Sequence, residues 1–243
     1  MRGLIFLLIV SAGVQPVQAA TPADDGFFPI AIIGTGSVGS ALGVSWGRLG
    51  HPIIYGSRNP DSERTRALVS RSGNARAVLP AEVAEHADVI VLALPFSAAL
   101  ELLPKLGALD GKLLIDPMNA LAFDRALSRV LVSDELLAEQ IQALAPTAKV
   151  VKALNTVGAR NMSPERVFDG PISVPIAGDD AGAKQTVTKL IEALALEVID
   201  VGPLFNARYV EAMAPLYVHM NFFVRPPGGF EFSFSSDSGA GSD

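Results

Sequence analysis

The sequence predicts an α/β fold, a doubly wound and mostly parallel sheet with a C-terminal helix, in a single domain. Three observations lead to this prediction. Short apolar runs alternate with segments of helical periodicity, which is typical of βαβ units. A glycine-rich turn at residues 34–39 joins the first apolar run to the first helical segment. The chain has 243 residues, of which 49% are apolar, and this is enough to bury a core without disulfides or structural metal ions.

The first element to justify is an apolar leader. Arg2 is followed by an apolar run at 3–14 and by a small-residue cleavage pattern with Val17 at −3 and Ala19 at −1. This layout predicts a secretory signal peptide at 1–19 and a periplasmic or secreted protein. The run is shorter than the roughly 20 residues of a spanning helix, so we expect no stable membrane span after cleavage. The alternatives are an uncleaved anchor, or a misassigned start codon and a cytoplasmic protein.

The remaining elements follow from periodicity and from turn residues. Strands are predicted at the apolar runs 29–33, 52–55, 88–94, 112–115, 149–153, 173–177 and 197–201. Helices are predicted at 37–49 with Gly50 as the C-terminal cap, at 61–70, as one or two helices within 121–143, and at 181–195 and 204–223. We expect the domain to span 29–230, followed by a frayed low-complexity tail at 232–243.

Composition narrows the classes of function. The chain has no Cys and three His, so a disulfide framework and Cys-based chemistry are excluded, and no metal centre is expected. It carries 19 basic and 25 acidic residues for a net charge of −6, which argues against a nucleic-acid partner.

The glycine turn carries the first chemical signal. Gly34, Gly36 and Gly39 fit the pattern G-x-G-x-x-G, directly after a predicted strand and at the start of a helix. The first glycine permits the tight turn, the second lets the backbone approach a pyrophosphate, and the third lets helix and strand pack closely. The helix N-terminus then binds the pyrophosphate. The motif predicts a dinucleotide site in an NAD(P)-binding Rossmann fold.

The end of the second strand selects the dinucleotide. An NAD-binding protein places Asp or Glu there, whereas this chain has Ser57 and Arg58. Arg58 can pair with a 2′-phosphate and Ser57 can donate a hydrogen bond to it, which favours NADP(H). Arg64 and Arg66 would add positive potential.

The carboxyl edge of the sheet should hold the nicotinamide ring, since ligands of open α/β sheets bind there. Leu94 ends the third predicted strand, and Asn119 and Asn155 follow the fourth and fifth. Either asparagine could bind the ribose or carboxamide, or serve only as a turn residue. No catalytic acid–base or nucleophile set stands out. Arg208 and Glu211 are expected to form a surface ion pair.

Several segments together carry a family resemblance: IAIIGTGSVGSALG, YGSRNP, VIVLALP, KALNTVGARNM, AGDDAGAK and VGPLFNARYVEAM. They resemble the coenzyme F-420-dependent NADP oxidoreductases, whose dinucleotide domain is related to those of pyrroline-5-carboxylate reductase and the STEAP metalloreductases. The resemblance runs from about residue 30 to about residue 234. It implies an enzyme that binds NADP(H) through Thr35, Gly36, Ser37, Val38, Ser57 and Arg58, with Leu94 nearer the nicotinamide. It also implies coenzyme F-420 or a flavin as second substrate, contacted by Asn119, Asn155 and residues 206–211.

These observations favour direct hydride transfer between NADP(H) and a deazaflavin- or flavin-type acceptor, a reaction that depends on aligned rings. Two alternatives stay open: a non-catalytic NADP-binding or sensor protein, and an imine reductase resembling pyrroline-5-carboxylate reductase. The expected partner is a small-molecule redox acceptor, and a homodimer is left open.

Overall fold

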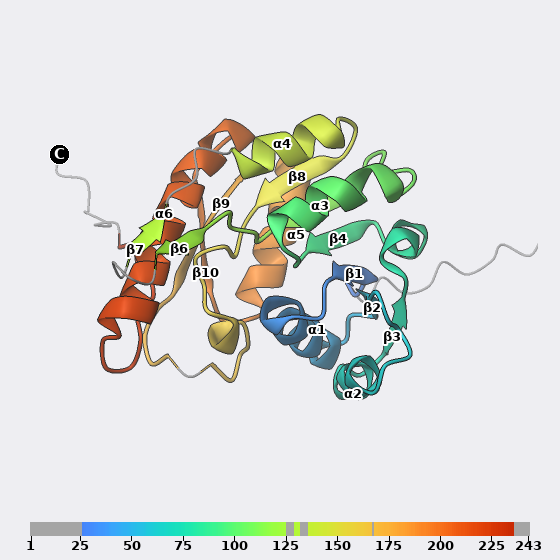
Figure 1. The fold of residues 1–243 in the computed structure, drawn as a ribbon, viewed down its shortest axis with the longest axis horizontal. Coiled ribbons are helices and arrows are strands. Elements are labelled where there is room, and N and C mark those ends of the chain that lie inside the picture. Colours follow the sequence, from blue (N-terminus) through green and yellow to red (C-terminus); the bar gives the residue numbers. More distant parts are fainter. Residues whose placement is uncertain (1–25, 125–128, 132–135, 167, 236–243) are drawn as a thin grey trace, which may run out of the picture.

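The computed structural model describes residues 26–124, 129–131, 136–166 and 168–235. The predicted leader at 1–19 and the end of the predicted tail, 236–243, lie outside these residues. Eight strands form one sheet in the order β10-β9-β8-β5-β4-β1-β2-β3, and a separate two-stranded hairpin pairs β6 with β7 (Figure 1). The strands are β1 Ile30–Ile33, β2 Ile53–Gly56, β3 Ala75–Val78, β4 Val89–Leu92, β5 Leu113–Asp116, β6 Ala122–Asp124, β7 Arg129–Leu131, β8 Lys149–Lys152, β9 Ser173–Gly178 and β10 Glu197–Asp200.

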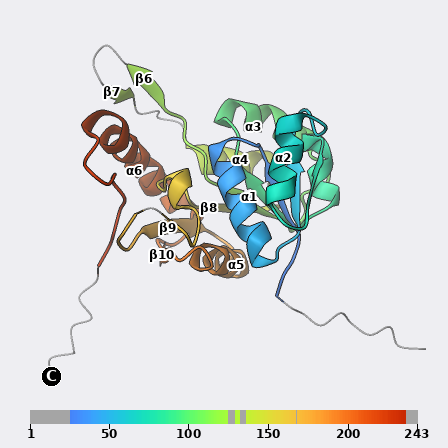
Figure 2. The same ribbon diagram turned by 90° about the horizontal axis from the view of Figure 1, so that it is seen from below.

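The helices cover both faces of this sheet. They are α1 Ser37–Leu49, α2 Glu63–Arg71, α3 Phe96–Leu102, α4 Leu137–Leu144, α5 Ala181–Glu192 and α6 Ala207–His219, with a π-helical turn at Met220–Val224 after α6. Short 3-10 turns lie at Pro80–Glu85, Leu103–Lys105, Ala159–Asn161 and Leu204–Asn206. Figure 2 shows α1 and α2 side by side, and α6 at the opposite end of the molecule beside the β6–β7 hairpin.

The sheet confirms the doubly wound α/β prediction. The adjacent strands β8, β5, β4, β1, β2 and β3 run parallel, and Ile30 of β1 aligns with Ile53 on one side and with Val89 on the other. The last two strands form a parallel βαβ pair that joins β8 in the antiparallel sense. No helix of eight or more residues lies between β8 and β9 among the described residues, and a parallel connection would need such a crossover.

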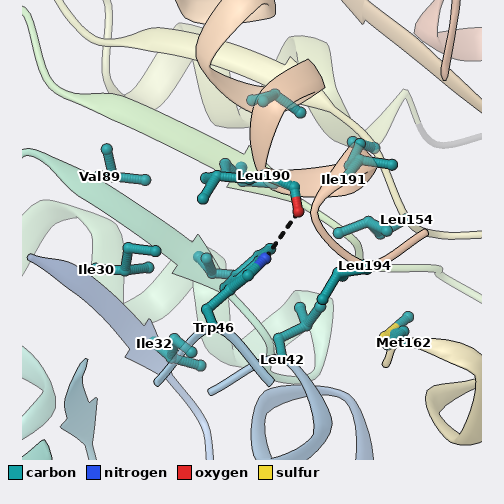
Figure 3. Close-up of a cluster of buried hydrophobic side chains, with 14 of the residues drawn as sticks. Ile30, Ile32, Leu42, Trp46, Val89, Leu154, Met162, Leu190, Ile191 and Leu194 are labelled. Atoms are coloured by element: carbon teal, nitrogen blue, oxygen red, sulfur yellow. Dashed lines mark hydrogen bonds between the residues drawn. The ribbon is translucent and has the colours of Figure 1, made fainter. Parts of the chain in front are cut away.

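Two hydrophobic cores lie on the two faces of the sheet. The first packs α1, α2 and α5 through residues such as Leu42, Leu68 and Ile191, and the second packs α3, α4 and the start of α6. Trp46, which is fully buried, spans the first core and donates its indole N–H to the carbonyl oxygen of Leu190 at 2.9 Å (Figure 3). Burial of these side chains holds α1, and with it the glycine turn, against the sheet.

Three sequence expectations need correction. Residues 121–143 hold the β6–β7 hairpin before α4, and the strand signal there is only a short apolar run at 130–132. The edge strand β3 was not predicted, because its residues are exposed or half-buried and its apolar pattern is weak. The expected fraying does not begin at Phe232: its carbonyl oxygen accepts the Ser173 N–H at 2.8 Å, which attaches the start of the predicted tail to β9.

Candidate functional site

The glycine turn connects β1 to α1 as the motif predicts. Gly34 has φ +110°, and a Cβ there would overlap the carbonyl oxygen of Ala93, while a Cβ at Gly39 would overlap the carbonyl oxygen of Gly34. Both positions therefore require glycine for close backbone packing. Gly36 differs, because a Cβ there would meet nothing within 4 Å. Gly36 and Ser37 are exposed at the start of α1, where free N–H groups and the helix dipole favour an anion.

Two arginines, Arg58 after β2 and Arg64 on α2, follow the strand next to this turn. Arg58 follows β2, is exposed, and makes no hydrogen bond or ion pair with the described part of the chain. Arg64 reaches back from α2 and donates to the carbonyl oxygen of Thr35 at 3.2 Å, so this guanidinium lies directly beside the glycine turn. The exposed Arg58 guanidinium is therefore available to an anionic ligand, and Arg64 adds a second positive charge beside the turn.

Ser57 supports this loop from inside. It is buried, and its hydroxyl contacts the Thr65 hydroxyl at 3.2 Å and accepts the Asn59 N–H at 3.2 Å. Thr65 in turn donates to the carbonyl oxygen of Asn59 at 3.1 Å. These bonds shape the backbone that carries Arg58.

A cavity of about 250 Å³ opens beside the glycine turn, at the carboxyl edge of the sheet. Its walls are Gly36, Ser37, Val38, Leu92, Ala93, Leu94, Pro95, Pro117, Met118 and Asn119. Pockets for whole ligands usually measure roughly 300–1,000 Å³, so this one fits a ring and its ribose, with the rest of a dinucleotide lying over the exposed turn. None of these wall residues carries an ionisable side chain.

A larger hollow of about 490 Å³ lies elsewhere, against the face of α1 that carries Val44 and Arg48. Size alone would make it the first candidate. It contains none of the residues that the sequence motifs select, so we assign the site to the smaller cavity.

The structure brings Asn119 and Asn155 together but gives them different positions. Asn119 lines the cavity and donates its amide to the carbonyl oxygen of Asn155 at 2.8 Å. Asn155 is buried behind it and donates to the Asn119 side-chain oxygen at 3.2 Å and to the carbonyl oxygen of Val210 at 3.0 Å. Asn155 therefore supports the cavity wall and fixes it to α6.

Comparison with known proteins identifies the family. Residues 29–120 match the family described as NADP oxidoreductase, coenzyme F420-dependent. A solved structure from Arthrobacter sp. FB24, provisionally described as an F420-dependent NADP reductase, superposes with a TM-score of 0.74 at 31% identity, covering 84% of this chain and 99% of that one. The F420-dependent NADP reductase of Methanocaldococcus jannaschii is 26% identical over 215 residues, which are 82% of this chain and 95% of that protein.

The chain belongs to the coenzyme F420-dependent NADP oxidoreductase family. It is an NADP-dependent oxidoreductase. Metalloreductase STEAP3 of Rattus norvegicus is 30% identical over 184 residues, but these are 76% of this chain and only 36% of that protein. An imine reductase from Aspergillus terreus, at 17% identity and a TM-score of 0.58, shares the fold alone.

This family member also has a buried ion cluster that the sequence does not predict. Lys152, at the end of β8, is fully buried and pairs with the buried Asp116 and the mostly buried Glu211, and we call these three residues the Lys152 cluster. Its members lie far apart in the chain, so no local motif could reveal them. The expected surface pair of Arg208 and Glu211 is wrong: Glu211 joins the cluster, and Arg208 pairs with Glu139 at 2.6 Å.

Within the described residues, no helix has the length and hydropathy of a membrane span. No group of three or more His, Cys, Asp or Glu side chains in that part of the chain could hold a metal ion.

Proposed function

We propose that this oxidoreductase transfers a hydride directly between NADP(H) and a deazaflavin- or flavin-type acceptor, coenzyme F420 being the first candidate. The observation that carries the proposal is the cavity beside the glycine turn, whose walls include small and apolar residues and no ionisable side chain among those described. A hydride moves between two aligned rings at close range without a protein acid or base. An imine or carbonyl substrate would instead call for a proton donor at this cavity.

The residues present fit a bound NADP(H). The space beside Gly36 is open, and a side chain at this position would obstruct a ligand that approaches the backbone. The first N–H groups of α1 would hold the pyrophosphate. Arg58, unpaired in the described part of the chain, would bind the 2′-phosphate, with Arg64 adding positive charge nearby. Thr35, Gly34 and Gly39 shape the turn, and Ser57 shapes the Arg58 loop.

The cavity would take the nicotinamide half. Val38 and Leu94 offer apolar surface to a ring, and the Asn119 side chain is the one amide in the described wall that could bind a carboxamide or ribose hydroxyl. When bound, NADPH supplies the hydride, while the protein orients the ring and keeps water from one of its faces. Solvent can supply the proton that the reduced acceptor also takes up.

The family relatives favour a deazaflavin acceptor. Two relatives that match this chain over more than nine-tenths of their own length carry the name F420-dependent NADP reductase. The metalloreductase match covers about a third of that relative, so metal reduction by the whole relative does not transfer to this chain.

Stopped-flow absorbance tests this function. The protein is mixed with NADPH and then, in separate experiments, with coenzyme F420, a free flavin or a ferric chelate. We expect rapid decay of the NADPH band with the deazaflavin and slower or no decay with the ferric chelate. Saturable NADPH binding without decay for any acceptor would contradict the proposal and would indicate a non-catalytic NADP-binding protein.

We also propose that residues 1–19 are a secretory signal that is removed from the mature protein. The support is the charge, apolar and small-residue pattern of this segment. Cleavage there leaves every described element intact, because these begin after Gly26. Export would place an NADP-dependent reaction in the periplasm or outside the cell.

A further inference from the structure

The Lys152 cluster lies directly behind the cavity wall. The ammonium group of Lys152 contacts an Asp116 carboxylate oxygen at 3.1 Å, a Glu211 carboxylate oxygen at 3.3 Å and the carbonyl oxygen of Met118 at 2.7 Å. Met118 is one of the residues that line the cavity. The side chains of Lys152 and Asp116 are fully buried, and Glu211 is 10% exposed.

The geometry gives Lys152 a structural task rather than a chemical one. A lysine ammonium has three protons to donate, and three oxygens surround this one. No proton is left for a molecule in the cavity. Met118 is held on both sides, since its carbonyl oxygen accepts from Lys152 and its N–H donates to Asp116 at 2.8 Å.

The cluster also connects this wall to two helices. Glu211, on α6, accepts the N–H groups of Leu137 and Ala138 at the start of α4, at 3.1 and 3.0 Å. A second connection runs alongside, from Asn119 through Asn155 to α6. The cavity wall at Met118 and Asn119 is therefore attached twice to α6.

A buried ion cluster usually adds little to the stability of a fold, because the desolvation of the charges costs about as much free energy as their attraction returns. Apolar side chains of similar volume often stabilise the fold equally well. Here the charges fix a backbone position at the edge of a cavity. We infer that Lys152 is a positioning residue, which sets the place of Met118 and Asn119 and thereby aligns the nicotinamide ring for transfer. This inference rests on the proposed function of the cavity.

The test compares Lys152→Met with Lys149→Met. Lys149 lies on the same strand, but its side chain is 43% exposed and pairs with Asp180 at 3.1 Å. Calorimetry measures the dissociation constants for NADPH and for adenosine 2′,5′-bisphosphate, which lacks the nicotinamide half, and stopped flow measures the hydride-transfer rate. For Lys152→Met we expect bisphosphate affinity within twofold of the wild type and at least a tenfold loss in NADPH affinity or transfer rate. Lys149→Met should change neither.

Equal losses for both ligands would overturn the inference, because they would indicate general damage to the fold. Unchanged NADPH affinity together with an unchanged transfer rate would overturn it as well. If Lys152→Met does not fold, Glu211→Gln carries the same test, since it removes one charge and keeps the size of the side chain. For that variant we expect at least a threefold loss confined to NADPH affinity or transfer rate, and its absence would overturn the inference.

The wild type separates this inference from the proposed function. A wild type that binds no NADPH overturns both. A wild type that binds and oxidises NADPH, beside cluster variants that behave like it, overturns the positioning role alone.

Discussion

The three glycines of the turn have different tasks at the scale of single residues. Gly34 and Gly39 are required by the fold, since a Cβ at either would overlap a backbone carbonyl oxygen. Gly36 has φ −77°, which suits any residue, and open space around it. The fold itself therefore does not require glycine at position 36. We expect that a ligand approaching the backbone there requires it.

Gly36→Ala consequently separates binding from stability. We expect its thermal midpoint to stay within about 2 °C of the wild type, in line with a stability change of a few tenths of a kcal/mol. Its affinity for NADPH should fall at least tenfold, because the new methyl group occupies the approach of the pyrophosphate. Differential scanning fluorimetry and an NADPH titration measure the two effects.

Gly39→Ala is the matched comparison, and it should lower the thermal midpoint because of the overlap with Gly34. A Gly36→Ala protein that binds NADPH as well as the wild type would contradict the placement of the pyrophosphate.

Arg58 should determine the choice between NADPH and NADH. A charge-assisted hydrogen bond contributes about 1.5–3 kcal/mol, which corresponds to roughly 10- to 150-fold in affinity. We expect Arg58→Glu to lose at least this much toward NADPH and little toward NADH, as measured by fluorescence titration of both. Arg76→Glu, which makes the same charge change at an exposed position of β3 outside the proposed site, is the control. Equal effects of the two variants would show that only general charge matters.

The sequence was sufficient for those residues whose role is local. Gly34 and Gly39 act within one turn, so spacing along the chain reveals their structural role. The binding roles of Gly36 and Arg58 stay predictions. Lys152 is different: its partners Asp116 and Glu211 are distant in sequence, and only the assembled sheet brings them together. The same holds for Asn155, whose placement behind the cavity depends on α6.

At the scale of elements, prediction succeeded where burial is strong. Helix α1 runs from Ser37 to Leu49 as predicted, because its apolar face packs under the sheet and Gly50 ends it with φ 118°. The fully buried strands were found for the same reason. The β6–β7 hairpin and the edge strand β3 were missed, since short or half-exposed strands leave only a weak pattern.

The segment after α6 is attached to residues 158–161 and to Tyr217 through Glu231, just beyond the predicted domain end at residue 230. One oxygen of this buried carboxylate accepts from Asn161 at 2.6 Å, from Tyr217 at 2.9 Å and from the Gly158 N–H at 3.3 Å, and the other has no partner in the described residues. Burial raises the pKa of Glu231 above its ordinary value of 4.5, although these bonds and the nearby Arg160 oppose the shift.

This pKa shift predicts a pH dependence of stability. Because the folded-state pKa is raised, the contribution of Glu231 is fully present below the ordinary pKa and is lost as pH rises through the folded-state pKa. Glu231→Gln does not titrate and keeps an accepting oxygen. The free energy of unfolding of the variant relative to the wild type should therefore increase across this pH window. Urea denaturation, followed by the fluorescence of the single tryptophan, measures it at several pH values.

Glu165→Gln, at an exposed position, should follow the wild type across the same range. Parallel pH profiles for Glu231→Gln and the wild type would contradict the assigned burial effect.

At the scale of the whole molecule, the leader and the reaction favour different compartments. A secretory signal implies export, whereas NADP(H) is used inside cells. We expect the native protein to have an intact mass that corresponds to loss of residues 1–19, because the cleavage pattern ends at Ala19. Mass spectrometry of material purified from the source cells decides this. Retention of the full leader would contradict cleavage, and a start near Val14 or Val17 would indicate a misassigned start codon. A homodimer stays a prediction.

The central claim is that NADP(H) binds across the glycine turn, with Arg58 on its 2′-phosphate and the nicotinamide in the cavity beside Leu94 and Asn119. Calorimetric titration of the wild-type protein with NADPH, and in parallel with NADH, tests it most directly. We expect one saturable site per chain for NADPH and at least tenfold weaker binding of NADH. Absence of saturable NADPH binding, or equal affinity for the two dinucleotides, would contradict it.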